Sequence, residues 1–223
     1  MKSEQEQFSA EGFVLAGGRS TRMGQDKALL RLAGRSLLEI ALGELRNLPL
    51  AAAPRIVAAR SDLSSHAEVI SDLHPGCGPL SGIEAALAAS TRPLNVVLPV
   101  DIPLLPAHFL LWMLQRAETT GAVMTVPRMN GRPQPLCAVY HRDLLSHITA
   151  SLRAGDYKVM PVVTAAARAH SSSHAMDIFD VELVSSANSE LLALSRLPPH
   201  RWFHNCNTPE DMAGLGNALV LTQ

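Results

Sequence analysis

The sequence of 223 residues is poor in cysteine, in aromatic side chains and in net charge. Its three cysteines, Cys77, Cys137 and Cys206, lie far apart without a C-x-x-C pair, which argues against a disulfide framework and against a zinc ribbon. The formal net charge is −1, whereas general nucleic-acid binding usually needs a large basic excess. We therefore expect reduced thiols, no nucleic-acid partner, and anion recognition only where basic residues gather locally.

Long apolar stretches are also missing. No run approaches the roughly 20 residues that span a bilayer, and the first twelve residues lack the apolar segment of a secretory signal. Hydrophobic residues nevertheless make up 47% of the chain, enough for a substantial core. We expect a soluble, cytoplasmic protein without a membrane partner, folded as a single domain over residues 1–223, with residues 1–11 as a flexible N-terminus.

Short apolar runs alternate with longer amphipathic ones, which indicates an α/β fold with a mainly parallel central sheet. Ser36 and Glu39 form an S-x-x-E capping box, which predicts the start of a helix. Residues 184–200 show no clear period and are left without an element, and Thr208 is expected to cap a last helix. The other elements that the pattern predicts are strands at 12–17, 55–60, 67–72, 94–101, 122–127, 135–141 and 176–182, and helices at 81–90, 107–118, 142–153 and 157–167.

A concentration of positive charge begins at two glycines, in the stretch LAGGRSTRMGQDKALL at 15–30. Residues 19–35 contain five basic side chains and a single acid, Asp26. Glycines let backbone N–H groups approach a ligand, and successive N–H groups form a concavity for anions. Arg22 and Lys27 would add full charges. We predict an anion-binding loop here; a plain tight turn is the alternative.

Two common phosphate loops do not fit this stretch. It does not match G-x-x-x-x-G-K-[ST], because Lys27 is followed by Ala28. It also has no G-x-G-x-x-G that opens a helix directly, which makes a dinucleotide oxidoreductase a poor match. The loop from Gly17 to Lys27 is long and is expected to fold over its ligand.

Two carboxylates follow predicted strands and so belong to the same edge of the sheet, where ligands of open parallel sheets bind. Asp101, in PVDIP, is placed to hold a Mg²⁺ shared with substrate phosphates, because Mg²⁺ takes few protein carboxylates. Asp72 ends the strand at 67–72. The alternatives are a turn-forming aspartate before Pro103 and a solvated acid at a strand end.

Several segments together resemble the molybdenum cofactor guanylyltransferase family, within the nucleotidyltransferases that have a Rossmann-like fold. They run in one order over most of the chain: LAGGRSTRMGQDKALL at 15–30, GPLSGI at 78–83, PVDIP at 99–103, QPLCAVY at 134–140 and NCNTPED at 205–211. The resemblance implies a Rossmann-like three-layer sandwich. Family members often carry an Asn after the second strand, where this chain has Ala59 and Arg60.

The resemblance also implies a reaction, the transfer of GMP from GTP to the phosphate of molybdenum–molybdopterin with release of pyrophosphate. Cofactor-delivery proteins and apo-molybdoenzymes are further partners that it suggests. Lys27, Asp101 and Arg22 would be catalytic, and Mg²⁺ on Asp101 the cofactor. The implied nucleotide-binding residues are Leu15, Ala16, Gly17, Gly18, Lys27, Asp72 and Asp101. The candidates for the second substrate are Asn207, Gln134 and Lys158.

Rival functions remain open on the sequence alone. Relatives that use CTP on the same cofactor tend to read LAAG where this chain reads LAGG, so Gly17 favours GTP. A sugar-1-phosphate nucleotidyltransferase fits the loop less well. From a different class, the chain could carry nucleotide or cofactor without catalysis, although a pure carrier has less need of both Lys27 and Asp101. His200 and His204 are expected to be structural or solvated, because prolines precede them.

Overall fold

The computed structural model of the chain describes residues 7–17, 26–170, 175–194, 197–206, 211–212 and 215. The strands are β1 (Ala10–Leu15), β2 (Arg31–Leu32), β3 (Arg35–Ser36), β4 (Arg55–Ala58), β5 (Val69–Ser71), β6 (Leu94–Pro99), β7 (Met124–Met129), β8 (Arg132–Pro133), β9 (Ala138–His141) and β10 (Met176–Asp180). The α-helices are α1 (Leu37–Arg46), α2 (Pro79–Ala89), α3 (Ala107–Thr120), α4 (Leu145–Arg153), α5 (Val159–His170), α6 (Val181–Ala187), α7 (Ser189–Ala193) and α8 (Pro199–Trp202). Short 3-10 turns are η1 (Lys27–Leu29), η2 (Asp62–Ser65) and η3 (Arg142–Leu144).

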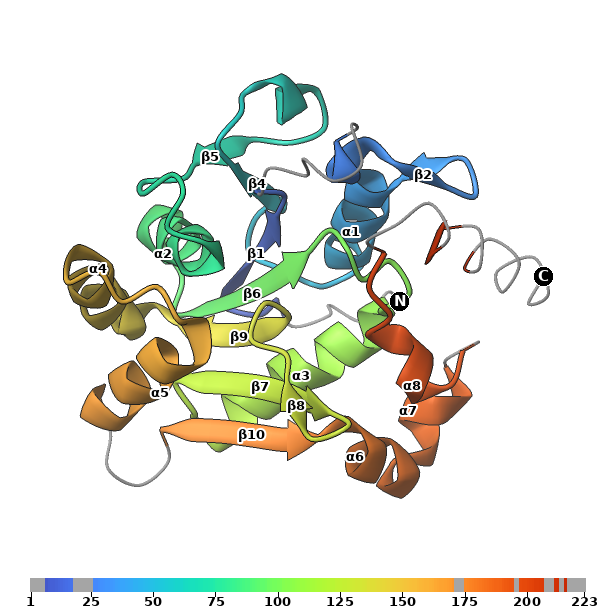
Figure 1. The fold of residues 1–223 in the computed structure, drawn as a ribbon. Helices are drawn as coiled ribbons and strands as arrows, with labels where there is room; N and C mark the ends of the chain where they lie inside the picture. Colours follow the sequence, from blue (N-terminus) through green and yellow to red (C-terminus); the bar gives the residue numbers. More distant parts are fainter. Residues whose placement is uncertain are drawn as a thin grey trace.

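The central sheet has the strand order β10-β7-β9-β6-β1-β4-β5, with β8 paired to β7 (Figure 1). Neighbours from β6 to β5 are parallel, as are β10 and β7. Only β9 runs antiparallel to both of its partners in the main path. The prediction of an α/β fold with a mainly parallel sheet is therefore confirmed, and β10, which falls in the predicted strand 176–182, lies at one edge of the sheet.

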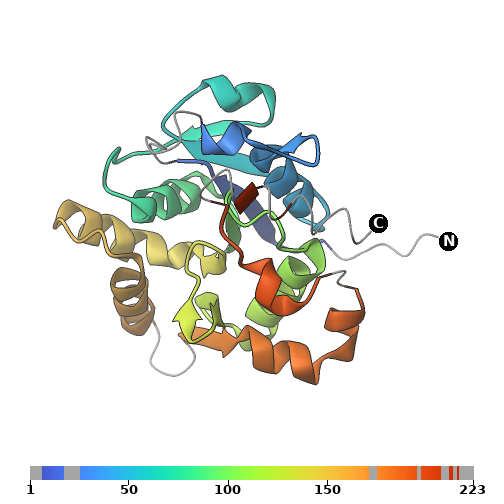
Figure 2. The ribbon, with the colours of Figure 1, turned by 45° about the vertical axis from the view of Figure 1, so that its right-hand side comes forward.

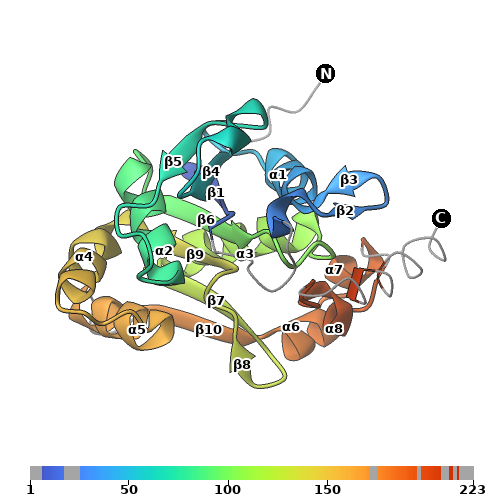
Figure 3. The same cartoon turned by 45° about the horizontal axis from the view of Figure 1, so that its top comes forward.

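Helices cover both faces of this sheet and make three layers (Figure 3). One apolar cluster packs α1 and α3 against the sheet, and a second packs α2, α4 and α5 against the opposite face. Strand β1 lies between them: Phe13 belongs to one cluster, Val14 to the other, and every residue from Ala10 to Leu15 is buried. This burial on both faces explains the continuous apolar run, as expected for a central parallel strand.

The topology fixes where a ligand can bind. From β1 the chain moves to β4 and β5 on one side, and β6 then returns to pair with β1 on the other. In the register Leu15 lies opposite Pro99, so these strands end at the same edge. Open α/β sheets bind ligands in the crevice at such a switch point, outside the carboxyl ends of the strands.

Local signals set several boundaries of these elements. In the capping box of α1 the Glu39 N–H donates to Ser36 Oγ (3.1 Å), and Glu39 Oε2 accepts from the Ser36 N–H (2.7 Å). Strands β7 and β8 are joined at Asn130 and Gly131, with φ of 50° and 72°. Two consecutive left-handed residues of the type Asn-Gly are typical of a tight hairpin turn.

The structure departs from the sequence prediction at the N-terminus. Of the predicted flexible segment 1–11, residues 7–11 are described, and Ala10 and Glu11 already belong to β1. Glu11 is buried because its carboxylate is paired with Arg55 and accepts a hydrogen bond from the Thr91 hydroxyl (2.8 Å). The strand therefore begins two residues before the predicted 12–17, and the burial of Glu11 rests on partners distant in sequence.

The region 184–200, left without an element, contains helices. The described part of it holds the end of α6, the short α7 and the start of α8. Helix α6 begins at Val181, so the predicted strand 176–182 ends two residues earlier, at Asp180. The predicted cap at Thr208 lies outside the described residues. No helix among those described is long and apolar enough to span a membrane.

Candidate active site

An ion pair marks the switch point of the sheet. Lys27 Nζ lies 2.9 Å from Asp101 Oδ2, with side-chain exposures of 20% and 29%. Asp101 lies in the turn after β6, and its carbonyl accepts the Cys206 N–H at 2.7 Å. The structure thus brings together the two residues that the sequence placed at the reacting phosphates. Their opposite charges are only partly solvated, at the edge where a polyanion and a cation would meet.

Lys27 is held by its neighbour in the chain. Asp26 Oδ1 accepts the Ala28 N–H (3.0 Å) and caps η1, the turn that carries Lys27. The other oxygen of Asp26 is hydrogen-bonded by Arg60, which also forks onto Asp62. The hydrogen bonds between Arg60 and Asp62 raise the pKa of Arg60 and lower the pKa of Asp62. The sequence prediction missed Arg60, since it treated position 60 only as a departure from the family pattern.

Strand β1 delivers the start of the predicted loop to the same edge. The Leu15 side chain is buried and packs against Gly82 of α2, and the Leu15 carbonyl accepts the Val100 N–H (3.3 Å). The Ala16 N–H donates to Val57 O (3.0 Å). Gly17 is exposed, and a Cβ built there would meet no heavy atom within 4 Å. Packing by the described residues therefore gives no reason for a glycine at this position.

Asp72 follows β5 and turns one oxygen inward. Its Oδ1 accepts the His74 N–H (2.9 Å) and the Ser81 hydroxyl. These bonds tie the loop 72–78 to the first turn of α2. The helix itself starts after Gly78, which has φ of 79° and provides no side-chain cap. The carboxylate is half-buried and so is not the fully solvated acid of the alternative interpretation.

Two adjoining cavities lie near this edge of the sheet, and the smaller one contains Asp101 of the ion pair. The smaller, of about 300 Å³, is lined by Pro79, Pro99, Asp101, Ile102, Gln134, Pro135, Leu136, Cys137, Val159 and Asn205. The larger, of about 470 Å³, is lined by Met129, Asn130, Arg132, Gln134, His200, Phe203, His204 and Asn205. Gln134 and Asn205 line both. These two residues therefore lie between the cavity that contains Asp101 and the cavity that contains Arg132 and two histidines.

The C-terminal segment 197–206 supplies one wall of the larger cavity and reaches the smaller one through Asn205. It passes beside the turn that follows β6 (Figure 2). Burial, together with the nearby charges of Asp211 and Asp101, raises the pKa of the Cys206 thiol to about 11, and the charge of Lys27 opposes this rise. The thiol is therefore protonated near neutral pH. Cys137 is also buried, and burial raises the pKa of its thiol.

The remaining predicted residues are placed as follows. Gly18, Arg22 and Asn207 lie outside the described residues. Lys158 is exposed, next to Val159 of the smaller cavity. Helix α8 ends at Trp202, so the two histidines at 200 and 204 do not share a helical face; instead they line the larger cavity. Sequence reasoning missed this shared position because residues 197–206 fold back over the sheet.

The donor set at Asp101 suits a cation that is shared with a substrate. Among the described residues there is no cluster of three or more His, Cys, Asp or Glu side chains that could enclose a metal ion. Mg²⁺ keeps several water or phosphate ligands and needs only one or two protein carboxylates. Asp101 Oδ1 accepts no hydrogen bond from the part of the chain that the structure describes, and this oxygen fits such a role.

Fold, loop and ion pair together define a nucleotidyltransferase of the Rossmann-like type. Residues 12–174 match the MobA-like NTP transferase domain. The chain belongs to this family, as the resemblance in its motifs implied.

Individual relatives agree with this assignment. The molybdenum cofactor guanylyltransferase of Xanthomonas euvesicatoria pv. vesicatoria is 32% identical over 92% of this chain and 93% of its own. That of Shewanella putrefaciens is 32% identical over 67% of this chain and 78% of its own. The crystal structure of molybdopterin-guanine dinucleotide biosynthesis protein A from Archaeoglobus fulgidus has a TM-score of 0.74 at 25% identity, and covers 95% of this chain and 99% of that one.

Proposed function

We propose that the protein transfers GMP from GTP to the phosphate of molybdenum–molybdopterin, with Mg²⁺ as cofactor, and releases pyrophosphate. The observation that carries the proposal is the Lys27–Asp101 pair at the switch point of the sheet, beside a cavity that contains Asp101. Relatives over nearly the whole chain are named for this guanylyl transfer. A cytoplasmic location, expected from the sequence, is part of the proposal.

In the proposed reaction a phosphate oxygen of the acceptor attacks the α-phosphorus of GTP in line. The bond from the α-phosphorus to the bridging oxygen breaks, and pyrophosphate leaves with the electron pair. Lys27 would bind phosphate oxygens of GTP, where its charge opposes the repulsion that the incoming phosphate meets. Asp101 would hold Mg²⁺, which, when bound, neutralises charge on the phosphates. Arg22, on the predicted loop, would add a further positive charge.

The protein need not supply a strong base or a nucleophile. A phosphate monoester has its second pKa near 6 and is largely ionised at pH 7. Holding two charged groups in line already contributes a large part of a rate enhancement. The described residues around Asp101 agree with this, since burial raises the pKa of both thiols near it, Cys137 and Cys206. Catalysis would rest on positioning and charge.

The two cavities suggest how the substrates divide. The cavity with Asp101 would take the triphosphate, and the larger cavity would take the acceptor. Arg132 offers a charged fork for a phosphate, and Phe203 offers an aromatic face for a flat ring. Gln134 and Asn205, which line both cavities, would contact both substrates, while Lys158 and Asn207 are further candidates for the acceptor.

The first test is pyrophosphate release with GTP, CTP or ATP, in the presence of Mg²⁺ and the molybdenum-loaded pterin. We expect release with GTP and little with the other two. Selective release of pyrophosphate from CTP would leave the proposed mechanism intact and would overturn the proposed specificity for guanine. Binding of GTP without release from any nucleotide would support a carrier. Omission of Mg²⁺, and its replacement by Ca²⁺, serve as controls for the metal.

A further inference from the structure

A buried carboxylate that the proposed mechanism does not use lies behind Asp72. Glu84 of α2 is one turn after Ser81, the residue that binds Asp72 Oδ1. Its side chain is 3% exposed. Glu84 Oε1 accepts the Thr149 hydroxyl of α4 at 2.6 Å. Oε2 is fully buried and accepts no hydrogen bond from the described residues.

His74 is the group that faces this oxygen. His74 Nε2 lies 3.4 Å from Glu84 Oε2. A buried carboxylate oxygen without a compensating donor is strongly unfavourable, so the imidazole N–H has a reason to stay at this position. The same residue donates its backbone N–H to Asp72 Oδ1. One residue therefore connects the buried carboxylate to the half-buried one at the sheet edge.

The loop between them has few other means of holding its shape. It contains Gly76 and Gly78, with φ of 89° and 79°, and α2 starts without a side-chain cap. The Cys77 N–H donates to the His74 carbonyl at 3.1 Å, so the turn also closes on His74. Fixing the imidazole would thus fix the turn, and the turn sets the direction of the Asp72 carboxylate.

We infer that Glu84 and His74 are positioning residues that aim Asp72 at the nucleotide; this inference rests on the proposed function. Asp72 Oδ2 accepts no hydrogen bond from the described residues and is the oxygen left for a ligand. A carboxylate repels phosphate oxygens, so its partner is a hydroxyl or N–H of the nucleoside. Glu84 and His74 would therefore affect binding of the nucleoside part of the nucleotide, whereas Lys27 and Asp101 would act on its phosphates.

The main test replaces Glu84 by Gln, which keeps the shape and removes the charge. We expect the KM for the nucleotide to rise about tenfold. This is the effect of losing one hydrogen bond to a charged group, here the bond between the Asp72 carboxylate and the nucleoside. We expect kcat at saturation to change less than twofold and the KM for the acceptor to stay constant. Because Glu84 acts through Asp72, Glu84→Gln added to Asp72→Asn should produce no further rise in the KM for the nucleotide.

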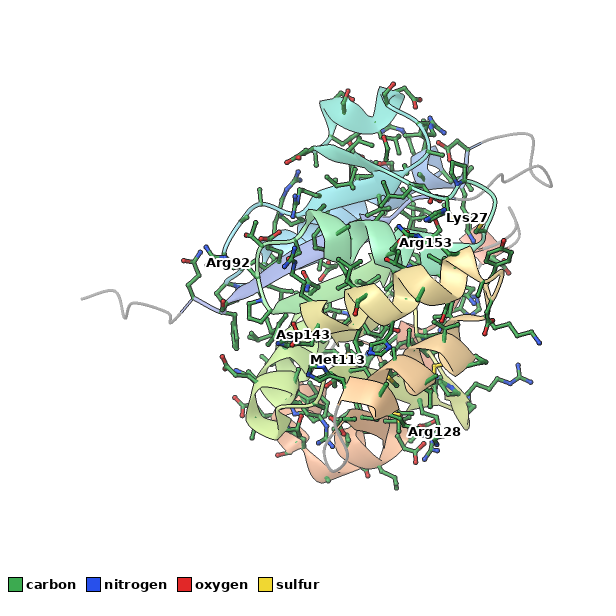
Figure 4. The ribbon with its side chains drawn as sticks, turned by 90° about the vertical axis from the view of Figure 1, so that its left-hand side faces the viewer. Lys27, Arg92, Met113, Arg128, Asp143 and Arg153 are labelled. Atoms are coloured by element: carbon green, nitrogen blue, oxygen red, sulfur yellow. The ribbon has the colours of Figure 1, made fainter. Side chains whose placement is uncertain are left out.

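A matched control exists at the other end of the strands. Glu11 is also buried, accepts a threonine hydroxyl (Thr91) and pairs with a cation (Arg55). Figure 4 shows the ends as far apart: Arg92, next to Thr91 in the chain, lies at the opposite end of the strands from Lys27. Glu11→Gln should lower the melting temperature and leave every KM unchanged.

Variants of His74, which is partly exposed, keep the inference testable even where Glu84→Gln does not fold. His74→Leu should raise the KM for the nucleotide as Glu84→Gln does, and His74→Gln, which retains an N–H donor, should restore part of it. Unchanged KM values in both Glu84→Gln and His74→Leu would overturn the inference. If the wild type prefers CTP, the proposed function fails in its base, while the same variants measured with CTP still decide the positioning role.

Discussion

Among single residues, Asp101 and Lys27 form an ion pair with each other but would serve different partners during turnover. Asp101→Asn keeps the shape of the side chain and removes the charge that would hold Mg²⁺. We expect turnover to fall about 100-fold or more, because charge stabilisation of this kind is worth that much in other enzymes. Stability should change by less than about 1 kcal/mol, since partly exposed ion pairs contribute little.

The measurement for Asp101→Asn is the rate of pyrophosphate release as a function of Mg²⁺ concentration, together with a thermal unfolding curve. Asp143→Asn is the matched control, because Asp143 is an exposed aspartate on η3, away from Lys27 (Figure 4). A near-normal rate in Asp101→Asn, with normal dependence on Mg²⁺, would refute the metal assignment.

Single residues also show what the sequence could and could not predict about the site. Lys27 and Asp101 were predicted because each stands in a local pattern: a charged loop after a strand, and an acid that ends a buried strand. Arg60 and Glu84 were not, because each depends on a partner distant in the chain, Asp26 for Arg60 and Thr149 for Glu84. No local spacing encodes such contacts.

At the scale of elements, the capping box of α1 makes a prediction about pH. Hydrogen bonds from the Ser36 N–H and hydroxyl lower the pKa of Glu39 below its ordinary value of 4.5. The folded state thus prefers the ionised carboxylate, and this contribution is complete above pH 4.5. It is lost as the pH falls through the lower, folded-state pKa.

Urea unfolding of the wild type and of Glu39→Gln between pH 7 and pH 3 tests this sign. The wild type should be the more stable of the two at pH 7, and the difference should shrink as the solution becomes acidic. Ser36→Ala should cost about 1 kcal/mol, as other N-cap replacements do. A difference between wild type and Glu39→Gln that grows toward pH 3 would contradict the assignment.

The β7–β8 hairpin is the element that carries the wall of the larger cavity. Gly131 has φ of 72°, and a left-handed alanine there would cost about 1–2 kcal/mol. We expect Gly131→Ala to move Asn130 and Arg132, which line the cavity, and so to raise the KM for the acceptor. The KM for GTP should stay constant. Gly121→Ala, at another left-handed glycine that ends α3, is the control and should alter stability alone.

The helices and strands were predicted from the sequence better than the contacts of single residues were. The helix at α1 and the strands at β4, β6 and β10 follow from caps and apolar periods, which are local. The short helices α6, α7 and α8 were missed because they are too short for a period to show. Leu183 and Leu194 are exposed while Val181 and Leu191 are buried, so their apolar pattern is set by tertiary packing.

At the scale of the whole molecule, the site depends on the path by which the C-terminal segment 197–206 returns to the sheet. No local sequence pattern predicts this path. The anchor of this return is Trp202, which is fully buried. Its ring lies 5.1 Å from Phe109 of α3, and its Nε1 donates to Leu197 O (2.9 Å). A few residues later the Cys206 N–H reaches Asp101 O, and Asn205 lines both cavities.

Trp202→Ala should therefore damage both stability and the site. We expect a loss of about 3–5 kcal/mol in the free energy of unfolding, as for other large core truncations. Met113→Ala is the matched control, because Met113 is fully buried in the same cluster but lies on α3 (Figure 4). At a temperature where both variants are folded, only Trp202→Ala should raise the KM for the acceptor and lower kcat. Equal kinetics in the two variants would mean that the segment reaches Asp101 without this anchor.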